Sequence, residues 1–220
     1  MIRPIRSYVL RQGRTTPAQK RALEELLPKY GIAYSDQPIS SARGAPLVLE
    51  IGSGMGETTI EIAKAHPEAD FVAVEVHGPG VGSLLNAIRR EDLTNLRILR
   101  HDALDVLEHM IPDGALAAIH LFFPDPWPKK RHHKRRLVQP AFAALAARKL
   151  KPGGILHAAT DWPEYAEQIA AVFLDSQAFD ESGCGFAARP VTKFESRGRR
   201  LGHPVRDLVF RRRGTAPAAR

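Results

Sequence analysis

The sequence predicts an α/β fold in which a mostly parallel sheet carries helices on both faces. Two observations support this fold: short apolar runs alternate with segments of helical periodicity, and the first apolar run ends in a glycine-rich turn. The runs have the composition of strands that are buried on both sides, as parallel strands usually are. With 220 residues, the chain is long enough for one well-buried domain and short for two.

The first 45 residues are basic and loop-like, and we expect a basic N-terminal extension over 1–45 with a helical patch at Pro17–Leu27. The main domain is expected over 46–213, where strands and helices alternate. The expected strands are Leu47–Ile51, Phe71–Val76, Leu96–Leu99, Ala117–Phe123 and Ile155–Ala159. The expected helices are Thr58–Ala65, Val81–Arg90, Ala103–Met110, Pro140–Leu150 and Pro163–Leu174.

The end of the chain departs from this alternation. The turn Lys151–Gly154 (Lys-Pro-Gly-Gly) should end the helix before it, because proline and glycine both interrupt helices. Extended pieces follow over Phe186–Arg213 and are expected to complete the sheet with an antiparallel edge. Residues 214–220 are expected to form a disordered tail.

Composition restricts the class of partner. The formal net charge is +8 and the sequence pI is about 9.9, which favours a polyanionic partner over a small acidic molecule. One cysteine, Cys184, allows no intrachain disulfide and is compatible with a cytoplasmic protein. No apolar run reaches the length of about 18 residues that a membrane span needs. The nine histidines show no metal-ligand spacing, so no metal is expected.

A glycine-rich loop follows the first expected strand, with the sequence Glu-Ile-Gly-Ser-Gly-Met-Gly-Glu over Glu50–Glu57. Gly52 and Gly54 permit a tight turn and a close approach of the backbone to a ligand. A dinucleotide-binding loop would need glycine where Glu57 stands, and an acid at a helix start repels a pyrophosphate. The acids suit a sulfonium or an ammonium group, so we expect S-adenosylmethionine rather than a nicotinamide cofactor.

Two further acids follow the next expected strands. Glu75 ends the second strand, where a sheet of this kind uses an acid to accept hydrogen bonds from ribose hydroxyls. Asp102 follows the third strand and suits an adenine amino group. Helix capping is the alternative role for these acids, and Asp102 is well placed to be an N-cap. With Glu50, they place three carboxylates at the ends of neighbouring strands.

A proline-stiffened, acid-bearing turn precedes a dense cationic run over Phe122–Arg136. The prolines at 124, 126 and 128 prevent an ordinary strand or helix, so Asp125 should be presented at a strand end. The cationic residues that follow can bind phosphates, although a solvated surface or a nuclear import signal has the same composition. Trp127 is equally suited to stacking on a base or to filling the core. The sequence favours a nucleic acid as partner.

These segments together resemble the bacterial tRNA (guanine-N7-)-methyltransferase family. The resemblance spans residues 6 to about 210, and its most specific motif is Pro-Asp-Pro-Trp-Pro-Lys-Lys at Pro124–Lys130. Its other parts are Arg6–Arg14, Glu50–Glu57, Glu75–Gly82, Thr160–Trp162 and Thr192–Gly198. It implies a Rossmann-like class I methyltransferase fold with a seven-stranded sheet, S-adenosylmethionine as donor, and guanine 46 in the tRNA variable loop as target.

The resemblance also implies roles for single residues. It makes Asp125 the catalytic residue and places the donor at Glu50, Gly52, Gly54, Glu75, Asp102 and Asp125. It implies substrate contacts at Lys129, Asp161, Thr192, Lys193, Phe194 and Glu195. The charge of the cationic run itself predicts RNA contacts at Arg131, Lys134, Arg135 and Arg136. The sequence departs from the family pattern at Pro163, which is harmless at the first position of a helix, and at Arg206, where an aromatic residue is expected.

Two other functions remain open at this point. One is an S-adenosylmethionine-dependent methyltransferase that acts on another RNA, a protein or a small molecule, which would leave the cationic run unexplained. The other is an RNA-binding module without turnover, because a fold alone does not fix a function. The oligomeric state is not encoded in any motif, and a monomer is the simplest expectation.

Overall fold

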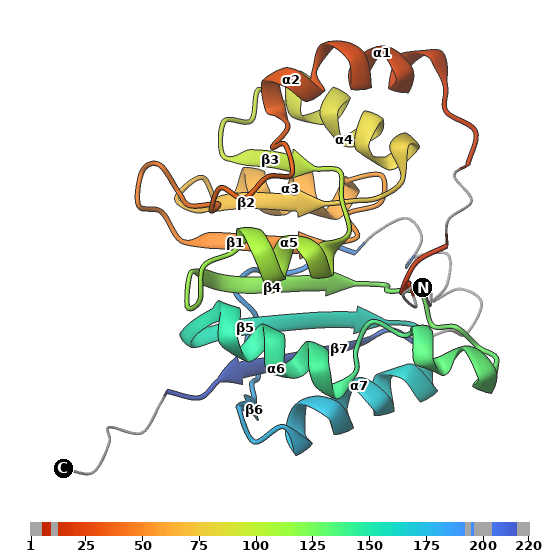
Figure 1. The fold of residues 1–220 in the computed structure, drawn as a ribbon, viewed down its shortest axis with the longest axis vertical. Helices are drawn as coiled ribbons and strands as arrows, with labels where there is room; N and C mark the ends of the chain where they lie inside the picture. The colour runs from red at the N-terminus through yellow and green to blue at the C-terminus, as the bar shows by residue number, and fades with distance from the viewer. Residues whose placement is uncertain (1–5, 10–12, 192–194, 196–203, 215–220) are drawn as a thin grey trace.

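The computed structural model describes residues 6–9, 13–191, 195 and 204–214, and it contains a seven-stranded sheet (Figure 1). The strand order is β3-β2-β1-β4-β5-β7-β6. The strands are β1 (Leu47–Ile51), β2 (Asp70–Val74), β3 (Leu96–Leu99), β4 (Leu116–Phe122), β5 (Leu150–Thr160), β6 (Phe179–Glu181) and β7 (Arg206–Arg212). The first five strands are parallel, and β7 runs antiparallel to both β5 and β6.

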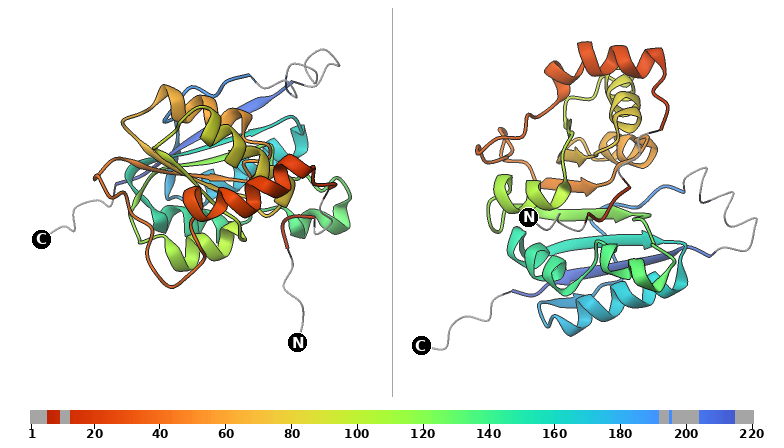
Figure 2. Two further views of the ribbon diagram at one scale, coloured as in Figure 1. Left: turned by 90° about the horizontal axis from the view of Figure 1, so that it is seen from above. Right: turned by 45° about the vertical axis from the view of Figure 1, so that its right-hand side comes forward.

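Helices cover both faces of the sheet, as the view from above shows (Figure 2). They are α1 (Pro17–Glu25), α2 (Leu27–Tyr30), α3 (Glu57–Ala65), α4 (Gly78–Arg90), α5 (Ala103–Met110), η1 (a 3₁₀ helix, Lys130–Arg135), α6 (Pro140–Lys149) and α7 (Pro163–Asp175). One hydrophobic core joins the sheet to α5, α6 and α7, and a second joins it to the helices α1 to α4. None of the described helices combines the length and apolar character needed to cross a bilayer.

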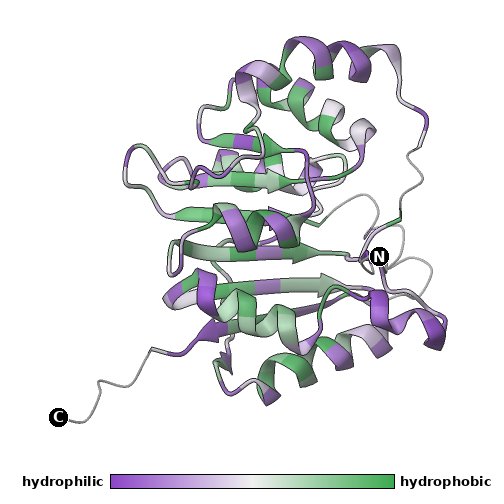
Figure 3. Ribbon diagram, in the orientation of Figure 1, coloured by the Kyte–Doolittle hydropathy of each residue, from purple (hydrophilic) through white to green (hydrophobic). Residues whose placement is uncertain are grey.

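Sequence explains the placement of these elements. Every residue of β1 and β4 is buried, because these central strands have helices over both faces. Hydrophobic residues accordingly dominate the central strands, whereas β7, near the edge of the sheet, is largely hydrophilic (Figure 3). Helix α1 begins with a capping box between Thr16 and Gln19, and α7 begins at Pro163, where a missing N–H costs nothing.

The predicted fold class is confirmed, including the antiparallel edge, and element bounds differ from the expected ones by a few residues. The largest difference lies in β5, which already begins at Leu150. Leu150 pairs with Leu116, and the register then shifts before Ala118 pairs with Ile155. The Lys151–Gly154 turn therefore ends α6 as expected but is absorbed into the strand as an irregularity, with Gly153 at φ 75°.

The residues before β1 pack onto the same core as the rest of the chain. Ala22, Leu26 and Tyr30 of α1 and α2 are buried against α4, and a Cβ on Gly82 of α4 would lie 2.6 Å from the Gln19 carbonyl oxygen. From β1 the chain builds outward through β2 to β3 on one side, and from β4 it builds to β5 on the other, so the strand order reverses between β1 and β4. Open α/β sheets bind ligands at the carboxyl ends of the strands beside such a reversal.

Candidate active site

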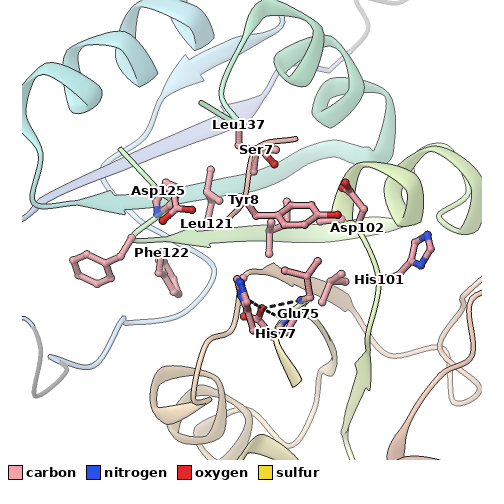
Figure 4. Close-up of a pocket in the computed structure, with 17 residues that line it drawn as sticks. Ser7, Tyr8, Glu75, His77, His101, Asp102, Leu121, Phe122, Asp125 and Leu137 are labelled. Atoms are coloured by element: carbon pink, nitrogen blue, oxygen red, sulfur yellow. Dashed lines mark hydrogen bonds and ion pairs between the residues drawn. The ribbon is translucent and has the colours of Figure 1, made fainter. Parts of the chain in front are cut away.

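A cavity of about 190 Å³ opens at this position, above the carboxyl ends of β1, β2 and β4 (Figure 4). Its walls come from the N-terminal segment, the glycine loop, the turns after β2 and β3, and the loop after β4, with Leu137 beside them. The residues that line it and carry polar side chains are Ser7, Tyr8, Glu75, His77, His101, Asp102 and Asp125. Three of the predicted site acids thus share one cavity.

The glycine loop reaches this cavity at Gly52, whereas Gly54 and Gly56 are not among the residues that line it. Gly52, Gly54 and Gly56 all have φ between 55° and 85°, a conformation that side chains rarely adopt. A Cβ on Gly52 or Gly54 would meet nothing within 4 Å, so the loop faces open space. On its other side the loop is tightly packed, because a Cβ on Gly80 would lie 2.5 Å from the Gly54 carbonyl oxygen. The loop therefore exposes bare backbone to the cavity.

Glu75 holds the loop in place. Its Oε2 accepts a hydrogen bond from the Gly54 N–H at 2.8 Å, and its Oε1 accepts from the N–H groups of Val76 at 2.7 Å and His77 at 2.8 Å. Glu50 lies below, within β1, and does not line the cavity. Burial raises the pKa of Glu50 to about 7, since the charged form loses its hydration there.

Asp102 stands at the opposite wall and has two neighbours. It is the N-cap of α5 and accepts a hydrogen bond from the Leu104 N–H at 2.9 Å, so the alternative capping role is present. The Tyr8 hydroxyl points toward Asp102 across the cavity (Figure 4). Burial, together with the charge of Asp102, raises the pKa of Tyr8. Asp102 therefore both caps a helix and faces the ligand space.

The segment Ser7–Val9 lies across the cavity. The sequence analysis did not assign any residue of this segment to the site. The Trp127 Nε1–H donates to the Ser7 carbonyl oxygen at 3.0 Å, and His77 Nε2 lies 2.8 Å from the Val9 carbonyl oxygen. Trp127 is thus tied to the N-terminal segment on one side. In the sequence, only the match of Arg6–Arg14 to the family motif pointed to this segment as part of the site, and that match did not indicate which of its residues would reach the cavity.

The proline-rich loop after β4 brings Asp125 to the cavity edge. Phe123 has φ 52° and Trp127 φ 45°, so two bulky residues on either side of Asp125 hold left-handed conformations. Such backbone strain costs about 1–3 kcal/mol per residue and is concentrated at functional sites. Loss of hydration of its carboxyl group raises the pKa of Asp125, and the nearby carboxylate of Glu75 acts in the same direction.

The cationic run continues from this loop into η1, which is the hydrophilic helix at the right of Figure 3. Lys129, Lys130, Arg131, Lys134 and Arg135 are exposed, and we call these five residues the cationic strip. The Arg135 guanidinium lies 4.8 Å from the centre of the Trp127 ring. Trp127 is thus enclosed by protein contacts on two sides.

Arg136 differs from its neighbours, because its side chain is only 1% exposed. Its guanidinium donates to the Pro126 carbonyl oxygen at 2.7 Å and to Gln168 Oε1 at 2.6 Å, and it lies over the Tyr165 ring. These contacts join the proline-rich loop to α7. The structure therefore does not present Arg136 to an RNA, contrary to expectation.

The remaining predicted residues lie around the cavity rather than in its wall. Asp161 follows β5 and is partly exposed, whereas the Glu195 side chain is fully buried and paired with Arg189. Thr192, Lys193 and Phe194 lie outside the described residues. Arg206 is exposed at the start of β7, where it pairs in register with Thr160. Among the residues described, no group of three or more potential metal ligands is found.

The cavity fits S-adenosylmethionine. The open space beside Gly52 accepts a ligand that lies against the backbone, and the carboxylates of Glu75 and Asp102 line the cavity as acceptors for hydroxyl and amino groups. Acids line the cavity, which suits a cationic sulfonium better than a pyrophosphate. These observations concern the residues present, and they agree with the donor expected from the glycine loop.

Comparisons with known proteins agree with this geometry. A family model described as putative methyltransferase matches residues 44–208. A tRNA (guanine-N(7)-)-methyltransferase of Nitrosospira multiformis is 55% identical over 219 residues, covering 96% of each chain. The protein of the same name from Nitrosomonas europaea is 56% identical, covering 95% of this chain and 97% of the relative.

Solved structures with low sequence identity show the same fold. The 16S rRNA methyltransferase KamB has a TM-score of 0.56 at 17% identity, covering 93% of this chain and 97% of that one. The aminoglycoside resistance methyltransferase NpmB1 has a TM-score of 0.55 at 14% identity, covering 94% and 98%. The sheet order, the glycine loop and the near-complete matches at over 50% identity lead to one conclusion: the chain belongs to the tRNA (guanine-N(7)-)-methyltransferase family.

Proposed function

We propose that the protein transfers a methyl group from S-adenosylmethionine to N7 of a guanine in tRNA, at position 46 of the variable loop. The observation that carries this proposal is the placement of Asp125, at the edge of a cavity suited to the donor and directly before the exposed cationic strip. A small-molecule methyltransferase has no use for five exposed cations beside its active site. The names and high identity of the relatives support the same reaction.

The acceptor needs little activation. S-adenosylmethionine supplies an electrophilic methyl group on a sulfonium sulfur, and guanine N7 has a lone pair that needs no deprotonation. The main contribution of this chain is therefore to hold the base in line with the donor, which can account for a large share of a rate enhancement. The strained loop over Phe123–Trp127 supplies a rigid edge for that alignment.

Methylation at N7 leaves the purine with a positive charge, and Asp125 is the carboxylate best placed to stabilise it. Partial loss of hydration raises the pKa of the Asp125 carboxyl, so an adjacent cation would be a favourable partner for its ionised form. Asp161, which is partly exposed, is proposed to recognise the guanine through its N1 and N2 hydrogen-bond donors. Glu195, whose side chain is fully buried against Arg189, is proposed to support this recognition. Lys129, which is exposed at the start of the cationic strip, is proposed to contact the phosphate nearest the base.

The remaining strip residues are proposed to hold the RNA backbone. Arg131, Lys134 and Arg135 project from η1 next to the proline-rich loop, so phosphate contacts there would set the register of the tRNA without reading its sequence. We also propose a cytoplasmic location, which a tRNA substrate and the single cysteine support. N-terminal residues 1–45 are proposed to assist, since Ser7–Val9 cross the cavity.

The deciding experiment is methylation of unmodified tRNA transcripts with labelled S-adenosylmethionine, followed by nuclease digestion and mass spectrometry. We expect 7-methylguanosine in the variable loop. A transcript with adenine in place of guanine 46 is the matched control and should accept no methyl group. Label at another nucleoside, or no transfer to any folded tRNA by protein that binds the donor, would refute the proposal.

A further inference from the structure

A buried arginine, Arg189, contacts both the end of β4, which leads into the Asp125 loop, and the carboxylate of Glu195. Arg189 lies in the connection between β6 and β7, and its side chain is 4% exposed. Its Nε and Nη2 donate to the two carboxylate oxygens of Asp207 at 2.8 and 2.9 Å. Its Nη1 donates to Oε2 of Glu195, whose side chain is fully buried. One guanidinium therefore holds a carboxylate on β7 and a carboxylate on the segment that precedes β7.

The same guanidinium also reaches the end of β4. Its central carbon lies 5.3 Å from the centre of the Phe123 ring and 5.8 Å from that of Phe122. Phe123 is the strained residue two positions before Asp125. Arg189 thus contacts both the base of the Asp125 loop and the segment that carries Glu195.

Asp207 anchors this arrangement to the sheet. Its Oδ1 also lies 2.8 Å from Nε2 of His157, which is buried on β5. Burial alone would raise the pKa of Asp207, but its hydrogen bonds with Arg189 and His157 outweigh this and lower it. Asp207 is therefore ionised, and the bidentate pair fixes the plane of the guanidinium.

The position of Glu195 depends on this anchor. A carboxylate without solvent contact is strongly disfavoured unless a cation and hydrogen bonds compensate it. Arg189 supplies both at once. Because two of its other contacts are made to strand β7 and to the end of β4, the guanidinium also determines where the compensated carboxylate lies.

We propose that Arg189 is a positioning residue for methyl transfer, which fixes Glu195 relative to the base of the Asp125 loop. This inference rests on the proposed function and deepens it. Arg189 does not itself line the donor cavity, although Phe122 and Phe123, which it contacts, both do. It therefore acts through Glu195 and Phe123.

Lys149 provides a matched control for a purely structural role. Its side chain is 5% exposed, and its ammonium donates to Asp113 Oδ1 and to the Ile111 carbonyl oxygen, both at 2.8 Å. It lies before the first residue of β5, at the end of the sheet away from the cavity. Loss of either buried cation should lower Tm by roughly 10 °C. Only loss of Arg189 should change the kinetics.

The kinetic test compares Arg189→Met with Lys149→Met at a temperature where both are folded. We expect Arg189→Met to lower kcat/KM for tRNA by at least about 30-fold, while the Kd for S-adenosylmethionine stays within about threefold. Lys149→Met should leave both quantities unchanged. Arg189→Lys keeps the positive charge but not the planar guanidinium, so it should retain part of the activity. It replaces the Met variant in the test if Arg189→Met does not fold.

A double-mutant cycle identifies the partner. If Arg189 acts through Glu195, Arg189→Met should cost less than about threefold in a Glu195→Gln background, instead of the full loss. If the losses in kcat/KM caused by Arg189→Met and Glu195→Gln multiply in the double variant, the inference is overturned. Normal kcat/KM in both folded Arg189 variants would overturn it as well.

A readout without tRNA separates this inference from the proposed reaction. Trypsin can cut after Lys193, two residues before Glu195. We expect native Arg189→Met to be cut there faster than Lys149→Met and wild type. Equal cutting rates would overturn the anchoring of the segment even if the wild-type enzyme methylates tRNA. A wild type without methyl transfer but with faster cutting of the variant would instead refute only the proposed function.

Discussion

The cationic strip makes a quantitative prediction about how tRNA binding depends on salt. Lys130, Arg131 and Lys134 are exposed and make no ion pair with any residue that the structure describes. Each cation that meets a phosphate contributes about 0.7 to 0.9 to the slope of log Kd against log salt. Replacing all three by alanine should therefore lower the slope by about 2.1 to 2.7.

This change in slope is large enough to measure by filter binding or fluorescence anisotropy. Between 50 and 200 mM salt, the wild-type Kd should rise about 20- to 40-fold more than that of the triple variant. The control variant carries alanine at Lys151, Arg211 and Arg213. These residues lie at the opposite end of the sheet, and replacing them removes the same amount of charge. If both triple variants have the same slope, the RNA does not bind along η1.

Three further predictions concern single residues. Asp125→Asn should lower kcat by about 100-fold or more, while the Kd for tRNA stays within about threefold. In the wild type, kcat should fall with decreasing pH at a value above the usual aspartate pKa, because the carboxylate is the active form and its pKa is raised, and this fall should be absent in the variant. An unchanged kcat would exclude the Asp125 carboxylate from the mechanism. Gly80→Ala would place a methyl group 2.5 Å from the Gly54 carbonyl oxygen, so calorimetry should show weaker S-adenosylmethionine binding by about tenfold, whereas Gly183→Ala, with open space, should bind normally. Arg206→Ala should lower the salt slope of tRNA binding by about 0.7 to 0.9, and an unchanged slope would place Arg206 outside the RNA interface.

The sheet and the donor cavity were predictable because their signals are local in the sequence. Apolar runs marked the five parallel strands, and the glycine loop with Glu75 and Asp102 marked the strand ends. Parallel strands bring their carboxyl ends to one edge, so those acids had to lie close together. The placement of Asp125 followed from prolines that no strand interior tolerates.

Arg136 shows what the sequence did not reveal. It is the last of a run of similar cations, and nothing in its side chain distinguishes it from Arg135. Only the path of η1 turns one guanidinium toward Gln168 and the other toward the Trp127 ring. The same holds for Arg189, whose partner Asp207 lies 18 positions further along the chain and is reached only through the antiparallel return of β7.

The strand order has a consequence for how the chain assembles during synthesis. Strand β6 pairs only with β7, although β7 is made last among the described strands. Until residues 206–212 leave the ribosome, β6 has no neighbour and the edge of β5 stays uncovered, which is a hazard for association between nascent chains. Strands β1 to β4, which carry the glycine loop, can pair before β7 has been synthesised. A chain shortened before Arg206 would lose two strands, together with the anchor for Arg189.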